Sequence, residues 1–193
     1  MSIAMVRASL AVDAEIADSL SKLAEAKHMT LYSLTNQILQ TFVEMMNENI
    51  EPQDVKALFR AHVLLRDLDA VVLPSEFMDM LIADLYAVNK EKLLERFRQL
   101  GRDVGKVLKV YAASVEELFE LAKTVGQFFP LKRLEVRPKQ MKQYEIALLG
   151  VGSRPESTQC VYESVKAILH EYGYRTRNET VGKGIIKCDI EPV

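Results

Sequence analysis

The sequence offers few residues with which to carry out covalent chemistry. Its three histidines, His28, His62 and His170, are far apart, and none lies in a metal-binding helix pattern, a nucleophile elbow or a phosphate-binding loop. His62 follows the apolar spacing of a helix, which favours a core histidine over a proton-transfer group. His170 is expected near a helix C-terminus, where a positive charge is favourable. We therefore expect no enzymatic activity.

The two cysteines do not indicate a metal or redox centre. Cys160 and Cys188 have neither CxxC spacing nor a flanking histidine. In the last expected strand, Ile186, Cys188 and Ile190 share one face, which favours reduced thiols in the core. We expect no bound metal and no cofactor.

A pair of glycines is the strongest candidate for an anion site. The segment "LLGVGSRPES" places Gly150 and Gly152 between an expected strand and an expected helix, where backbone amides can hold an anion. Arg154 adds a positive charge beside the helix start. Pro155 stands where a dinucleotide fingerprint has its third glycine, so a nucleotide site is disfavoured. A turn before a capped helix explains the same residues.

The N-terminal segment "MVRASLAV" alternates in polarity as a half-buried strand does. Two faces result, one with Ala8, Leu10 and Val12 and the other with Arg7, Ser9 and Ala11. Helical patterns begin at Asp13 and again after Thr30, which can cap the second helix. No other segment of residues 1–47 alternates, so we expect the partner strand to come from a second copy, paired antiparallel about a two-fold axis. The sequence predicts a homodimer or a higher even oligomer.

This order of elements resembles the ribbon-helix-helix family of DNA-binding repressors, the Arc and MetJ class, over residues 1–47. The resemblance implies that the paired strands enter the major groove of double-stranded DNA and read base edges. The residues it assigns to DNA binding are Arg7, Ser9 and Ala11 on the strand, and Thr30 and Leu31 at the phosphate-binding start of the second helix. Arg7 suits a guanine, Ser9 either class of base, and Ala11 a thymine methyl group.

Two features of this module depart from that family. His28 stands where the turn between the helices usually has glycine, so it must adopt a left-handed conformation or a different turn. Residues 1–47 carry three basic and five acidic side chains, a net charge of −2 per copy. DNA affinity depends heavily on cations that release phosphate counterions. A dimerisation clasp that does not bind DNA therefore remains an alternative.

The rest of the chain is expected to be an α+β domain. Residues 47–54 are polar and contain Pro52, so we expect a linker before a domain at 54–193. A helical middle follows, and its first stripe is Val55, Leu58, Phe59 and His62. Gly101 and Gly105 form a small flat face on a helix. Either another helix packs closely against this face or a ligand lies on it. From residue 131 we expect an antiparallel sheet covered by a helix, in the order strand, strand, helix, strand, strand.

Residues from about 75 to 191 also resemble the four-vinyl-reductase-like ligand-sensing domains, which are related to haem nitric-oxide sensors. The resemblance lies in "LGRDVGKVL", the acidic helix "SVEELFEL" and the closing sheet with its cysteine-containing strand. It implies a small-molecule effector. The cysteine cluster of many members is absent, since only Cys188 has a comparable place, so no metal site carries over.

These observations predict a DNA-binding transcriptional regulator that acts as a homodimer, with a C-terminal ligand-sensing or oligomerisation domain. The chain has neither an apolar run of ~20 residues nor a secretory signal, so we expect a cytoplasmic protein without membrane contact. Residues 132–193 have a net charge of +3, which could serve DNA, an anionic ligand or an acidic partner subunit. The alternatives are a non-DNA-binding dimeric scaffold, and a small-molecule-binding protein or enzyme with a pocket near Gly101, Gly105 and Gly152.

Overall fold

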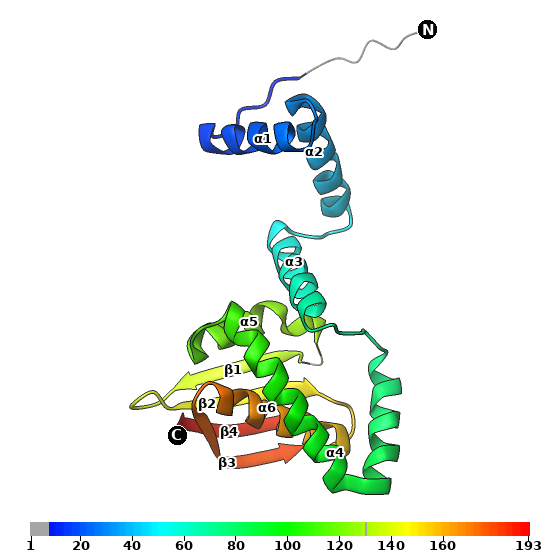
Figure 1. The fold of residues 1–193 in the computed structure, drawn as a ribbon, viewed down its shortest axis with the longest axis vertical. Coiled ribbons are helices and arrows are strands. Elements are labelled where there is room, and N and C mark those ends of the chain that lie inside the picture. The colour runs from blue at the N-terminus through cyan, green and yellow to red at the C-terminus, as the bar shows by residue number, and fades with distance from the viewer. Residues whose placement is uncertain (1–7, 130) are drawn as a thin grey trace. The chain divides into compact units, whose positions relative to one another are not determined.

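The computed structural model describes residues 8–129 and 131–193 of the chain (Figure 1). The chain divides into two compact units, Met1–Val55 and Lys56–Val193, here called the N-terminal and C-terminal units. The helices are α1 (Ala14–Ala26), α2 (Leu31–Asn47), α3 (Pro52–Asp67), α4 (Ser75–Tyr111), α5 (Val115–Val125), the short 3-10 helix η1 (Gly126–Phe128) and α6 (Pro155–Glu171). Within the described residues, no helix has the length and apolar character that crossing a bilayer requires.

The turn between α1 and α2 is closed by a residue in the left-handed region. His28 has a φ of 54°, and its amide donates to the Glu25 carbonyl oxygen at 3.0 Å. The Met29 amide reaches back to the Ala24 carbonyl oxygen at 2.9 Å. These two hydrogen bonds together form the Schellman motif, in which glycine is the usual left-handed residue. Of the two alternatives that the sequence left open, a left-handed His28 or a different turn, the structure has the first.

The strand expected before α1 does not form within one chain. Residues 8–12 are exposed and have no strand assignment, and Arg7 lies outside the described residues. A strand satisfies its backbone amides and carbonyls only when a partner pairs with it. The ribbon therefore stays a prediction about two chains.

Helix α3 buries a different stripe from the one that the sequence suggested. Its buried residues are Ala57, Ala61 and Leu64, while Phe59 is 66% exposed and His62 is exposed. The expectation of a core histidine at position 62 is therefore wrong. Apolar residues occupy two neighbouring faces of α3, and periodicity alone does not tell which of them packs.

Helix α4 consists of two helical parts joined at Asn89. The φ and ψ of Asn89 are −157° and 85°, and its side-chain oxygen accepts from the Lys92 amide at 3.0 Å. Asn89 thus acts as the N-cap of the second part. In that part, a Cβ on Gly101 would lie 2.3 Å from the Ser164 carbonyl oxygen of α6. The glycine face is therefore filled by α6, which confirms close helix packing and removes Gly101 and Gly105 as a ligand surface.

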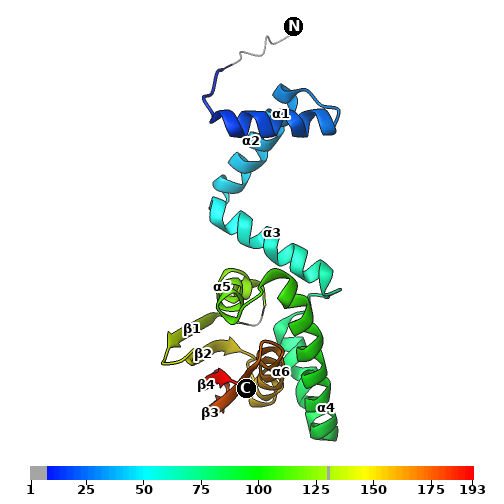
Figure 2. The same ribbon diagram turned by 60° about the vertical axis from the view of Figure 1, so that its left-hand side comes forward.

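The C-terminal unit is α+β, as predicted, with strand, strand, helix, strand, strand as its final order. Its strands are β1 (Arg133–Pro138), β2 (Tyr144–Val151), β3 (Tyr174–Gly182) and β4 (Gly184–Pro192). They form one antiparallel sheet in the order β1-β2-β4-β3. Figure 2 shows α6 between this sheet and the second part of α4. The core beneath α6 includes Ile186, Cys188 and Ile190, the stripe that the sequence placed on one face.

Several cations of the sheet form ion pairs with carboxylates of neighbouring strands. Lys139 lies 2.5 Å from Asp189, and Arg175 lies 2.8 Å from Glu191. Lys187 lies 3.3 Å from Glu145. These carboxylates are already counted in the net charge of +3 for residues 132–193, so the pairs leave that excess unchanged.

Candidate functional site

The residues assigned to DNA contact fall into two groups in the N-terminal unit. Ser9 and Ala11 precede α1 with exposed side chains, and Arg7 lies outside the described residues. Thr30 and Leu31 are adjacent at the start of α2, and both are exposed. One chain thus brings Thr30 and Leu31 together at the start of α2, while Ser9 and Ala11 lie in the segment before α1.

The start of α2 has the geometry of a phosphate site. Thr30 Oγ1 accepts from the Ser33 amide at 3.1 Å, which leaves the hydroxyl proton able to donate to another group. The Leu31 amide occupies the first position of the helix, where N–H groups point outward and the helix dipole is positive. An anion at this point would meet both donors.

The N-terminal unit has few positive charges with which to hold DNA. In the described part of the unit, the basic side chains are Lys22 and Lys27. Lys22 already lies 2.6 Å from Asp18, one turn away on α1. Both partners are exposed, so this ion pair is weak. Even with Lys22 counted, the described part of the unit offers little positive charge to a phosphate backbone.

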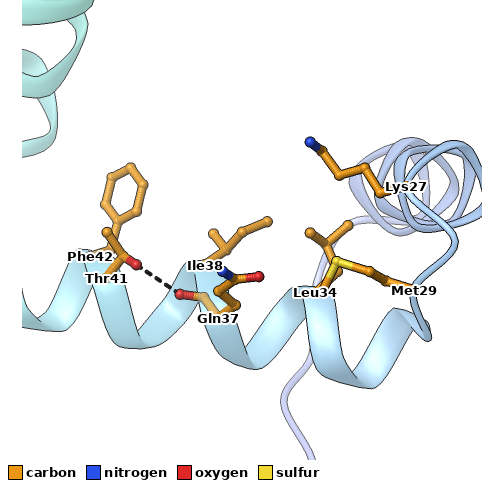
Figure 3. Close-up of a pocket in the computed structure, with 7 residues that line it drawn as sticks. All are labelled: Lys27, Met29, Leu34, Gln37, Ile38, Thr41 and Phe42. Atoms are coloured by element: carbon orange, nitrogen blue, oxygen red, sulfur yellow. Dashed lines mark hydrogen bonds between the residues drawn. The ribbon is translucent and has the colours of Figure 1, made fainter.

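An open apolar groove of about 600 Å³ runs along α2. Figure 3 shows Leu34, Ile38 and Phe42 on one side of the helix, with Met29 and Lys27 at one end of the groove. The polar atoms of Thr41 are turned to the backbone, because its hydroxyl donates to the Gln37 carbonyl oxygen at 3.0 Å. The groove is therefore a hydrophobic surface with little to offer a polar ligand.

The N-terminal unit leaves most of its apolar side chains exposed. Among its described residues, only Ala24 and Leu34 are buried. Large side chains that are more than a third exposed include Ile16, Leu23, Leu31, Leu39, Phe42, Val43 and Met46. A unit of this size with two buried residues lacks a core of its own.

The loop that suggested an anion site is already occupied by a carboxylate of this chain. The Ser153 amide donates to Asp79 Oδ2 at 2.9 Å, and the Ser153 hydroxyl donates to the same oxygen. Asp79 extends from α4 and is 5% exposed. A second anion would be repelled here. The structure therefore contradicts the anion-site hypothesis and makes this loop a structural clamp.

The ionisation of Asp79 follows from the same contacts. Burial acts to raise its pKa, but the hydrogen bonds from Ser153 and the nearby charge of Arg154 outweigh that effect and hold the pKa below its ordinary value. The ionised carboxylate fastens the first part of α4 to the start of α6. Sequence analysis missed this role, although a lone acidic residue within the apolar run "FMDMLI" was a signal for it.

A second buried carboxylate fastens the later part of α4 to α6. Glu163 is 4% exposed and accepts from Arg98 Nε at 2.7 Å, while Lys166 Nζ lies 2.7 Å from its other oxygen. Burial acts to raise the pKa of Glu163, and the two cations reverse the shift and lower it. Arg98, Glu163 and Lys166 thus form an ion-pair cluster that holds α4 against α6.

The cysteines are core residues, as the sequence indicated. Burial raises the pKa of the Cys160 thiol to about 11 and that of Cys188 to about 12, so both are protonated near neutral pH. Across the two described stretches, no group of three or more metal-ligating side chains gathers. His170 lies exposed in the last turn of α6, where a cation was expected.

Comparisons with known proteins add little to this picture. No protein-family model matches the sequence, and no curated protein matches it. Among solved structures, a double mutant of Tt H-NOX aligns with 73% of this chain and 93% of its own, at 15% sequence identity and a TM-score of 0.37. A likeness this distant carries no argument about fold or function, which must be inferred from the residues described above.

Proposed function

We propose that this chain is a homodimeric DNA-binding transcriptional regulator, with a C-terminal unit that senses a small molecule or sets the assembly state. The observation that carries the proposal is the uncovered apolar surface of the N-terminal unit. Ile38 and Phe42 line an open groove, and the described residues before α1 pair with no strand of the described chain. A second copy related by a two-fold axis meets both needs.

In such a dimer, the two N-terminal segments pair as antiparallel strands and present Arg7, Ser9 and Ala11 on one face. That face enters the major groove, and the start of α2 in each copy holds a flanking phosphate through Thr30 and Leu31. Arg7 supplies the strongest single base contact, because a guanidinium can donate two bonds to one guanine. Phosphate contacts then fix the register of the dimer on the duplex.

The charge of the module sets the expected salt dependence. Each copy has three basic residues between positions 1 and 47, so a dimer offers six. The slope of log affinity against log salt therefore has an upper limit of about −5. Binding should be weak without the correct sequence, because the nonspecific electrostatic contribution is small.

The test is a selection of bound genomic fragments, followed by fluorescence anisotropy on the selected duplex. Arg7→Ala removes one bidentate contact from each copy and should weaken binding by about 30-fold or more. Arg60→Ala is the matched control, because it makes the same change at an exposed position of α3, outside residues 1–47. Equal binding by wild type and Arg7→Ala would overturn the assignment of the reading face.

A dimeric scaffold is the second candidate function. The observation in its favour is the charge of residues 1–47, a net −2 per copy, which opposes DNA binding. The scaffold and the regulator share the same dimer. Only the regulator predicts salt-dependent enrichment of particular fragments in the selection, so a dimer that selects no DNA would favour the scaffold.

A further inference from the structure

The first part of α4, residues 75–89, has one face in the core and another in solvent. On the inner face, Asp79 and Ile82 are buried, and Ile82 and Tyr86 pack in one cluster with Cys160 of α6. In Figure 1 this part of α4 forms the margin of the C-terminal unit. An α-helix has 3.6 residues per turn, so the residues between the inner positions include a stripe that faces away from α6.

The outward stripe is apolar. Phe77, Leu81, Leu85 and Val88 recur at intervals of four, four and three residues, which places them on one side of the helix. Residues 71–73, two valines and a leucine, come shortly before the helix begins. All of these side chains are between 39% and 84% exposed, and together they are here called the α4 surface.

The α4 surface is large enough to form a specific interface. A methylene group accounts for roughly 30 Å² of surface and a phenylalanine side chain for about 200 Å². Weighted by their exposed fractions, the side chains of the α4 surface expose roughly 500 Å² per copy. Soluble monomers rarely expose a contiguous apolar patch of more than a few hundred Å². Two copies that meet through this surface would bury about 1,000 Å², which is the area that a specific interface needs.

The stripe is complementary to itself. Two helices that run antiparallel about a two-fold axis present the same residues to each other in reverse order. An axis that passes between Leu81 and Leu85 sets Phe77 of each copy against Val88 of the other, and Leu81 against Leu85. Each apolar side chain of the stripe then meets another one, and ridges of side chains can pack into grooves.

The charges at the two ends of this helical part also favour antiparallel pairing. Glu76 lies in the first turn, while Lys90, Glu91 and Lys92 follow the kink with a net charge of +1. Among the described residues, none of these four side chains forms an ion pair. An antiparallel second copy brings Glu76 toward Lys90 of the other chain. Asp84 lies at the margin of the stripe, where interfaces have a polar rim.

We propose that the α4 surface is a self-association interface, through which the first parts of α4 from two copies pack antiparallel about a two-fold axis. The inference rests on the proposed function only in placing this contact in the same dimer as the N-terminal one, since the surface itself belongs to the C-terminal unit. It gives the C-terminal unit a direct part in setting the assembly state.

The first test is disulfide cross-linking of Leu81→Cys in the full chain without DNA. A cysteine beside the two-fold axis lies close to its own copy, as a disulfide requires. The native Cys160 and Cys188 are buried, so they do not compete for the oxidant. Leu100→Cys is the matched control, because Leu100 is a 51% exposed leucine on the second part of α4. We expect a covalent dimer from Leu81→Cys and none from Leu100→Cys.

The second test is sedimentation equilibrium of Leu85→Asp, again in the full chain. Leu85 is 54% exposed, so the single chain should tolerate the change. In the dimer, two-fold symmetry places two new charges in an apolar contact and near Asp84, so the dissociation constant should rise at least a hundredfold. Leu100→Asp makes the same change outside the α4 surface and should leave the constant unchanged.

Two results would overturn the proposal: no covalent dimer from Leu81→Cys, or a Leu85→Asp dimer as tight as wild type. In either case a different partner covers the α4 surface, and a dimer through the N-terminal unit is unaffected. If Leu85→Asp dissociates the dimer while Phe42→Ala does not, the α4 contact is supported and the N-terminal contact is refuted. Failure of this inference is therefore distinguishable from failure of the proposed function.

Discussion

Phe42→Ala is the sharpest test of the dimer that the proposed function requires. A phenylalanine presents about 200 Å² of surface, and Phe42 is 37% exposed in the single chain. A partner that covers this remainder buries about 75 Å² per copy, worth about 2 kcal/mol at 25 cal/mol per Å². Two-fold symmetry applies the loss to both copies, so the dimer should weaken by about 4 kcal/mol, or roughly a thousandfold in dissociation constant.

Sedimentation equilibrium of the full chain measures this constant directly. Gln40→Ala is the matched control, because Gln40 lies on the opposite face of α2 and its side-chain amide donates to Glu44 of the same helix at 3.0 Å. Wild type and Gln40→Ala should be dimeric at low micromolar concentration, and Phe42→Ala should be largely monomeric. A folded wild-type monomer under these conditions, or a Phe42→Ala dimer as tight as wild type, would refute the reasoning.

Three further predictions concern stability, measured by chemical unfolding of the full chain. His28→Gly should stabilise the N-terminal unit by about 1 kcal/mol, because glycine relieves the left-handed strain at φ 54°; an unchanged midpoint would contradict this account of the turn. Asp79→Ala should cost about 1–3 kcal/mol by leaving the Ser153 amide without its acceptor. Because folding lowers the pKa of Asp79, this stabilisation should be complete above the ordinary carboxyl pKa of about 3.9 and be lost as the pH falls below it. If the free energy of unfolding changed with pH in the same way in wild type and in Asp79→Asn, this account of Asp79 would be wrong. Gly101→Ala should cost about 1–3 kcal/mol or more, since its Cβ would meet a backbone oxygen of α6, whereas Gly182→Ala meets no atom within 4 Å and should be neutral.

The α+β half of the chain was predictable because its patterns are local. Strand alternation in "QYEIALLGVG" and the helical stripe through Val161, Val165 and Ile168 are each set by which residues face one core. The glycines flanking Lys183 located the hairpin between β3 and β4. Each of these signals depends on a few consecutive residues, so long-range packing did not alter it.

The errors arose where tertiary contacts decide between local alternatives. Helix α3 has apolar residues on two faces, and it packs through Ala57, Ala61 and Leu64 because small side chains allow close approach. The loop with Gly150 and Gly152 was wrongly predicted as an anion site, because the carboxylate that occupies it belongs to Asp79, which is far away in the sequence.

A small molecule can regulate the proposed DNA binding only if it favours one arrangement of the dimer over another. Linkage then requires DNA to change the affinity for the small molecule by the same factor as the small molecule changes the affinity for DNA. A tenfold change corresponds to about 1.4 kcal/mol of coupling, and it should be the same whichever of the two affinities is measured. If a small molecule binds the chain and neither affinity changes, that molecule has no role in DNA recognition, and a regulatory mechanism must then act through the assembly state.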